Sequence, residues 1–260
     1  IMYAEAADVT IACVGLDASL EGEEGDTGNE FFSGDKKDLR IPESQRKLLA
    51  VLQQSARKLV TVIAAGSSLN VEEGNACVFA WYPGQAGGTA LAGLLFGEKN
   101  FSGHLPLTFY RDISELPAFE EYAMKNRTYR YFTGTPLYPF GYGLSYTSFS
   151  LSAAELNDGE VIAKVQNTGS REGDALVQVY VSCDSPFAPV HPRLCGFRRI
   201  PLAAGETASV AVRLDPLTST VVNEDGKRLE SERFKLYVGL SQPDDQSVAM
   251  SGVPPIVIQK

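Results

Sequence analysis

The chain has 260 residues, 44% of them hydrophobic and 21% charged, which is the composition of a globular protein of one large or two smaller domains. Its 32 acidic and 23 basic residues leave a net charge of −9, which argues against a nucleic-acid partner, because phosphate binding needs clustered Lys and Arg. No apolar run approaches the roughly 20 residues of a membrane helix. We therefore expect a soluble protein with no membrane partner, either cytoplasmic or secreted.

Three buried strands are expected in the first 110 residues. Nearly continuous apolar runs occur at 8–14, 59–65 and 76–81, and each ends at a glycine or in a Tyr-Pro-Gly turn. Such runs are typical of strands that are buried on both faces of a sheet. Cys13 and Cys77 lie within these runs, so we expect both to be buried small hydrophobic residues.

Helices are expected between these strands. Pro42 suits the first turn of one helix, whose apolar stripe would be Leu48, Val51 and Leu52. A second helix is expected from about Gly88 to Phe96, with a glycine cap after it. Strands that alternate with helices predict a mostly parallel sheet covered on both faces, here assigned to residues 1–110.

The pattern changes after about residue 145. Apolar and polar residues alternate in four segments, and turn residues separate them; the segments are 161–166, 177–182, 210–214 and 234–238. Period-2 strands without an intervening helix predict an antiparallel β-sandwich over 146–260. Residues 111–145 are rich in aromatics, Pro and Gly, and we expect them to form an ordered connector.

One loop concentrates groups that can carry chemistry. Soon after the first strand, residues 21–30 hold five carboxylates and no basic residue; the acids are Glu21, Glu23, Glu24, Asp26 and Glu30. Loops at the carboxyl ends of parallel strands are where α/β proteins bind ligands. Crowded carboxylates raise one another's pKa, and a protonated carboxylic acid is what cleavage of a glycosidic bond requires. A solvated acidic loop and a cation site remain alternatives, although the spacing does not fit an EF-hand.

Other chemistries find little support. The two histidines, His104 at the start of an expected strand and His191 in a Pro-rich loop, favour structural or solvated roles. Cys183 and Cys195 flank that loop and could form a disulfide, but their spacing does not fix the geometry. The segment that starts at Trp81 fits either a sugar-stacking platform or a buried turn that leads into the next helix.

Taken together, several segments resemble glycoside hydrolase family 3. They are Val14-Gly-Leu-Asp-Ala-Ser-Leu-Glu-Gly-Glu, Ala80-Trp-Tyr-Pro-Gly-Gln-Ala-Gly-Gly, Ser102-Gly-His-Leu-Pro-Leu-Thr-Phe, Arg127-Thr-Tyr-Arg-Tyr-Phe, Pro136-Leu-Tyr-Pro-Phe-Gly-Tyr-Gly-Leu-Ser-Tyr and Cys195-Gly-Phe-Arg-Arg-Ile-Pro-Leu. The resemblance covers nearly the whole chain, in the family's order. It implies an α/β/α sandwich, truncated at its N-terminal side, followed by a fibronectin type III-like (immunoglobulin-like) β-sandwich. His104 stands where Arg is commoner in the family.

The resemblance also implies a function. Family members hydrolyse terminal β-linked sugars with retention, and use an aspartate nucleophile on an N-terminal barrel domain that this chain does not contain. Glu21 falls where many relatives place the acid/base, and Glu23 is its competitor. The substrate would be an oligosaccharide or glycoside, with β-xylosides preferred over β-glucosides, and no cofactor or metal is implied. The barrel would be the partner of this chain, which by itself would be inactive. A non-catalytic structural or carbohydrate-binding module is the alternative.

Overall fold

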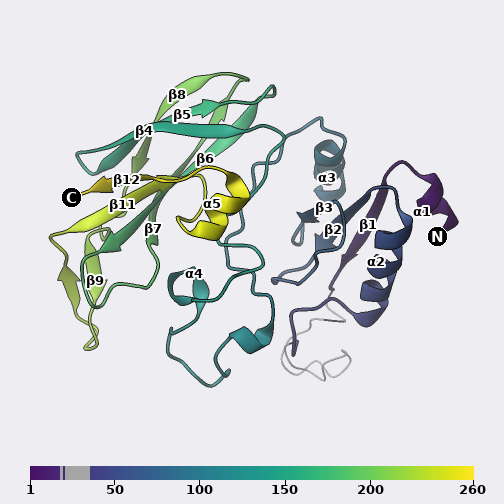
Figure 1. The fold of residues 1–260 in the computed structure, drawn as a ribbon, viewed down its shortest axis with the longest axis horizontal. Coiled ribbons are helices and arrows are strands. Elements are labelled where there is room, and N and C mark those ends of the chain that lie inside the picture. The colour runs from purple at the N-terminus through teal and green to yellow at the C-terminus, as the bar shows by residue number, and fades with distance from the viewer. Residues whose placement is uncertain (18–19, 21–35) are drawn as a thin grey trace. The chain divides into compact units, whose positions relative to one another are not determined.

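A computed structural model describes residues 1–17, 20 and 36–260 (Figure 1). The chain divides into two compact units. The sheet unit comprises Ile1–Glu98 with Phe109–Glu115, and the sandwich unit comprises Lys99–Thr108 with Leu116–Lys260. Within the part of the chain that the structure describes, every helix is too short or too polar to cross a membrane.

The sheet unit contains the predicted parallel sheet. Its strands are β1 (Thr10–Gly15), β2 (Leu59–Ala64) and β3 (Ala76–Phe79), hydrogen-bonded in the order β1-β2-β3. All pairs are parallel, which confirms the α/β prediction for this region. The central strand β2 is largely buried on both faces, as its uninterrupted apolar sequence predicts.

Strand β1 departs from the prediction. Ala12 and Val14 are buried, whereas Ile11 is 45% exposed and Cys13 is exposed. Since side chains alternate across a strand, one face of β1 packs in the core and the other is uncovered. The expectation that this strand is buried on both faces is therefore wrong, and so is the expected burial of Cys13. Cys77 on β3 is half-buried.

Three helices accompany the sheet: α1 (Met2–Ala6), α2 (Glu43–Ser55) and α3 (Gly87–Leu95). Pro42 precedes the first turn of α2, as expected. The predicted stripe on this helix is right at Leu52, which packs against the core, but wrong at Leu48 and Val51, which are exposed, and it missed the fully buried Leu49. Leu49 joins the core of the sheet unit together with Ala12, Val14, Leu16, Ile41, Leu59, Ile63, Ala65, Leu69 and Val71.

The sandwich unit contains two antiparallel sheets, as the period-2 segments predict. One has the strand order β12-β11-β6-β7 and the other β4-β5-β8. The strands are β4 (Phe149–Asn157), β5 (Glu160–Asn167), β6 (Gly173–Cys183), β7 (Arg193–Leu202), β8 (Thr207–Arg213), β11 (Phe234–Gly239) and β12 (Ile256–Gln259). A separate ribbon pairs β9 (Thr220–Val222) with β10 (Arg228–Glu230).

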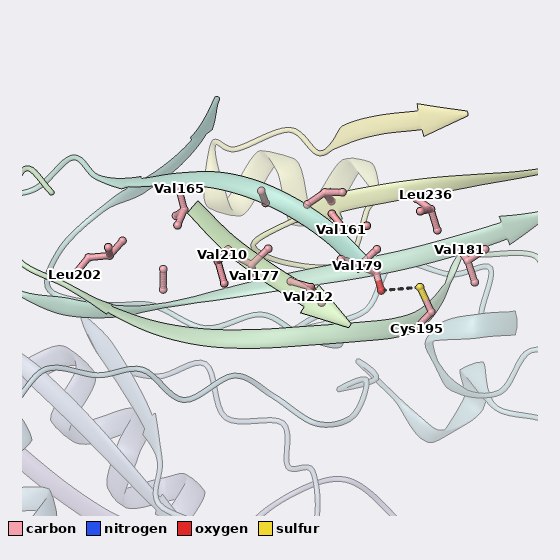
Figure 2. Packing of buried hydrophobic residues seen from close by; sticks show 13 residues of the cluster. Val161, Val165, Val177, Val179, Val181, Cys195, Leu202, Val210, Val212 and Leu236 are labelled. Carbon is pink, nitrogen blue, oxygen red and sulfur yellow. Dashed lines mark hydrogen bonds between the residues drawn. The ribbon is translucent and has the colours of Figure 1, made fainter. Parts of the chain in front are cut away.

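The two sheets enclose a core of small branched side chains (Figure 2). Val161 and Val165 of one sheet pack with Val177, Val179 and Leu236 of the other, and all five are fully buried. Each of these strands contributes every second residue, which explains the alternation that is visible in the sequence.

As predicted, no helix lies between the four strand segments that the sequence identified, all of which fall in the described residues 36–260. Helix α5 (Asp245–Ser251) follows the last of them, between β11 and β12, and was not predicted. Asp244 caps the helix by accepting a 2.9 Å hydrogen bond from the Ser247 N–H, and Gly252 ends it in the left-handed conformation. Both are ordinary helix-boundary signals.

Cys183 and Cys195 are free thiols rather than a disulfide. The β6–β7 register pairs Val179 with Gly196 and Val181 with Arg193, so the two cysteines lie at different levels of the ladder. At about 3.3 Å per residue, they are about 10 Å apart along the strands. That exceeds the roughly 7 Å between Cα atoms that a disulfide can span.

The aromatic connector packs within the sandwich unit. Tyr129, next to Arg130 in the short helix α4 (Thr128–Tyr131), stacks on Phe140 with ring centroids 4.1 Å apart. The buried Gln178 side chain donates a 3.0 Å hydrogen bond to the Gly141 carbonyl and accepts one of 2.7 Å from the Tyr180 hydroxyl. These contacts explain why so many aromatics occur here. The short 3₁₀ helix η1 (Ile113–Glu115) belongs to the sheet unit.

Candidate active site

The carboxyl ends of β1, β2 and β3 lie at one edge of the sheet. Gly15 pairs with Ala64, and Ile63 pairs with Phe79, so the three strands end at similar levels. The ladder continues one residue further on each side of β2, because the Leu16 N–H donates to the Ala64 carbonyl and the Ala80 N–H donates to the Ile63 carbonyl, both at 2.9 Å. Loops at this edge form the ligand-binding rim of open α/β sheets.

The acidic loop starts at this edge. Its predicted catalytic residues, Glu21 and Glu23, lie outside the described residues, as do Glu24, Asp26 and Glu30. The described residues around them are anchored. Leu16 is buried in the core of the sheet unit, and Leu20 packs against the same core and donates a 3.0 Å hydrogen bond to the Asp17 carbonyl.

Gly15, the last residue of β1, is held from a second direction. Its N–H donates to the Gln45 Oε1 atom, and its carbonyl accepts from the Gln45 Nε2 atom, each at 2.9 Å. A Cβ atom at this position would lie 1.8 Å from the Ala64 carbonyl oxygen, so only glycine fits against β2. Sequence reasoning did not single out Gln45, because one glutamine near the start of a helix belongs to no recognisable motif.

The Trp81 segment combines features of the two predicted alternatives, a sugar-stacking platform and a buried turn. The Trp81 ring contacts the Phe79 and Phe109 rings at centroid distances of 6.0 and 6.3 Å, and this packing holds the residue in a left-handed conformation with φ 54°. Trp81 therefore belongs to a packed turn before α3. Tyr82 is 55% exposed, and its ring lies against Gly66 after β2, where an added Cβ would come within 2.8 Å of the ring. Among the described residues, Tyr82 presents an exposed aromatic ring at this edge.

Both histidines make backbone contacts in the sandwich unit. His191 donates through Nε2 to the Phe132 carbonyl at 2.8 Å, and His104 donates through Nδ1 to the Ser102 carbonyl at 3.2 Å. Burial lowers the pKa of His104, and the neighbouring Arg199, which also donates to the Ser102 carbonyl, lowers it further. A neutral His104 that holds a loop fits a structural role. The strand expected to begin there is absent from the described segment 101–107.

An α/β unit with a parallel sheet, followed by an antiparallel sandwich, defines the class of protein. Residues 2–146 match the model of the glycosyl hydrolase family 3 C-terminal domain, and residues 175–242 match that of the fibronectin type III-like domain. The chain belongs to glycosyl hydrolase family 3.

Curated relatives are glycosidases by name. A xylan 1,4-beta-xylosidase of Xylanibacter ruminicola is 40% identical over 90% of this chain, and a periplasmic beta-glucosidase of Salmonella typhimurium is 33% identical over 92%. Among solved structures, the Bifidobacterium adolescentis GH3 beta-glucosidase matches 98% of the chain with 27% identity and a TM-score of 0.78. The chain spans about a third of the length of these proteins: 29%, 34% and 39% respectively.

Proposed function

We propose that this chain forms the acid/base side of the active site of a retaining exo-β-glycosidase. The observation that carries the proposal is the acidic sequence that follows β1 in a family 3 chain, directly after Leu16 and Leu20, which are attached to the core of the sheet unit. Carboxylates that follow this strand reach the rim where an α/β domain meets its ligand. A neutral sugar substrate is compatible with the acidic net charge of the chain.

Glu21 is the proposed general acid and base. In the first step, the protonated Glu21 carboxyl donates its proton to the glycosidic oxygen while a carboxylate nucleophile attacks the anomeric carbon. In the second step, the ionised Glu21 takes a proton from water, which releases the sugar with its configuration retained. The nucleophile is proposed to be an aspartate on a barrel domain outside this chain, about 5–5.5 Å from Glu21, as retention requires.

A terminal β-xylosyl residue is the preferred substrate, and a β-glucosyl residue is second. Two observations support this order: the Leu20-Glu21-Gly22-Glu23 form of the loop, and the 40% identity to a protein named as a xylan 1,4-beta-xylosidase. The comparison of kcat/KM for aryl β-xylosides and aryl β-glucosides, measured on the enzyme that contains this chain, tests the order. A glucoside preference of tenfold or more would reverse it.

The acid/base role is tested by Glu21→Gln in the same enzyme. Hydrolysis of xylobiose, whose leaving group is a poor one, should slow by about 100- to 10,000-fold. A dinitrophenyl xyloside should be affected much less at the glycosylation step, because its leaving group needs little protonation. Azide should restore deglycosylation and yield a β-glycosyl azide.

Glu23→Gln is the matched control. The assignment moves to Glu23 if that variant shows the pattern and Glu21→Gln does not. The 260-residue chain alone should hydrolyse neither substrate, since it would supply only one of the two carboxyls. Turnover by the purified chain would contradict the two-part active site.

A further inference from the structure

A side-chain amide takes the place of a neighbouring strand at the end of β1. The Leu16 N–H bonds to β2, so the N–H and C=O groups of Gly15 point away from β2, because successive residues of a strand face opposite sides. Gln45 satisfies both groups, at 2.9 Å each. Its amide therefore pairs with Gly15 as one residue of an added strand would.

The Gln45–Gly15 pair fixes the direction in which the chain leaves the sheet. Gly15 contacts the Ala64 backbone on one side, where no side chain fits, and Gln45 on the other. Only five residues separate Gly15 from Glu21, and two of them, Leu16 and Leu20, are attached to the core of the sheet unit. A change in the exit path at Gly15 would therefore be passed on to the start of the acidic loop.

We propose that Gln45 is a positioning residue for the acid/base loop, an inference that rests on the proposed function of Glu21. In this proposal Gln45 takes no direct part in the chemistry. It acts by holding the Gly15 peptide groups, which set where the loop begins. Displacement of a catalytic group by about 1 Å can cost about 100-fold in rate, so a loss of both hydrogen bonds should be visible in catalysis.

The same helix offers a matched control. Gln53, also on α2, accepts a 2.7 Å hydrogen bond from the Gly74 N–H. Gly74 precedes β3 and therefore lies at the amino-terminal edge of the sheet, opposite the edge at which β1 ends. Gln45→Met and Gln53→Met remove the same chemical group from one helix. The first variant loses two hydrogen bonds to a glycine backbone, and the second loses one.

The experiment measures how well each variant discriminates between leaving groups, in the enzyme that contains this chain. Gln45→Met should lower kcat on xylobiose by about 10- to 100-fold, and on a dinitrophenyl xyloside by less than about threefold, because loss of acid catalysis affects mainly the poor leaving group. Gln53→Met should leave the ratio of the two rates unchanged. A purely structural role would lower both rates equally, through the fraction of folded enzyme.

Three results would overturn the inference. If Gln45→Met leaves the ratio unchanged while Glu21→Gln changes it, only the positioning role fails. If Glu21→Gln also leaves the ratio unchanged, the proposed acid/base fails and the inference fails with it. If Gln53→Met changes the ratio as much as Gln45→Met does, the effect is not specific to the Gly15 contact. If Gln45→Met does not fold, Gln45→Glu replaces it, because that variant keeps the acceptor for the Gly15 N–H. Its ratio of the rates on xylobiose and on the dinitrophenyl xyloside then tests the positioning role in the same way.

Discussion

The two units differ in how their cores are enclosed. The sandwich unit holds its core between two sheets, with Val177, Val179 and Leu236 fully buried. In the sheet unit, strand β1 of the parallel sheet has one face uncovered, at Ile11 and Cys13. Large apolar side chains are exposed in both units, so the difference lies in the uncovered face of β1 and not in the amount of exposed apolar surface.

This difference matches the division of roles that we propose. A self-contained core makes the sandwich a stable carrier. The uncovered face of β1 suits contact with further protein, and the curated relatives are about three times as long as this chain. The chemistry is assigned to the sheet unit, at the loops that follow β1, β2 and β3. We therefore expect the two units to respond separately to substitution.

The largest effect is expected from Gly15→Ala. The new Cβ would lie 1.8 Å from the Ala64 carbonyl oxygen, so β1 would have to separate from β2. We expect a loss of about 4 kcal/mol or more in the sheet unit. Hydrogen exchange should accelerate in β1 and β2 and stay slow in β6 and β11. The matched control is Gly205→Ala, where φ is 76° but no atom lies within 4 Å, and its cost should be about 1 kcal/mol within the sandwich unit.

Leu236→Ala should have the second largest effect. The side chain is fully buried between the sheets, and its truncation should cost about 3 kcal/mol in the sandwich unit. Trp81 is the single tryptophan of the chain and reports on the sheet unit. Its fluorescence transition in urea should therefore stay in place, while exchange in β6 and β11 accelerates. An equal shift of the Trp81 transition would mean that the units unfold as one.

Leu48→Ala provides the reference for an exposed position. The Leu48 side chain is 49% exposed on α2, so its truncation should change stability by less than about 0.5 kcal/mol. A loss close to that of Leu236→Ala would show that the Leu48 face of α2 is covered in solution. The contrast in burial between Leu48 and Leu236 would then be wrong.

The sequence predicted the fold correctly where the spacing of apolar residues matches the side chains that are buried in the structure. Alternation in 161–166 and 177–182 identified strands whose inward residues are Val161, Val165, Val177 and Val179. The uninterrupted run of β2 likewise predicted a strand covered on both faces. The nearly identical run of β1 misled, because apolar composition does not reveal whether anything covers the second face. Leu48 and Leu49 illustrate the same limit, since both are leucines and only the packing distinguishes them.

The sequence predicted where the acidic loop begins, but not the contacts that hold its start. The acidic composition of residues 15–30 and their place after a strand identified the loop. Gln45 left no trace in the sequence pattern, since its role arises from a contact between residues 30 positions apart. The non-bridged Cys183 and Cys195 are a related case, because only the β6–β7 register shows that they lie at different levels.

The smallest predicted effect concerns alkaline stability and contrasts Cys195 with Cys13. Burial in the sandwich core raises the pKa of Cys195 to about 12, whereas the pKa of a thiol in the unfolded chain is about 9. Below pH 9 the thiol is neutral in both states. Between pH 9 and 12 it ionises only in the unfolded state, so stability falls as pH rises, by up to about 1.4 kcal/mol per pH unit.

Cys195→Ala should therefore lose less stability than the wild type between pH 8 and 10, by about 1 kcal/mol, although truncation lowers its stability at pH 8. Urea unfolding at both pH values in the presence of a reductant, followed by circular dichroism, measures this difference. Cys13→Ala, which alters an exposed thiol in the sheet unit, should match the wild type in its pH dependence. If Cys195→Ala and Cys13→Ala share one pH profile, the Cys195 thiol is not held neutral by the core. Its burial would then not distinguish it from the thiol on the uncovered face of β1.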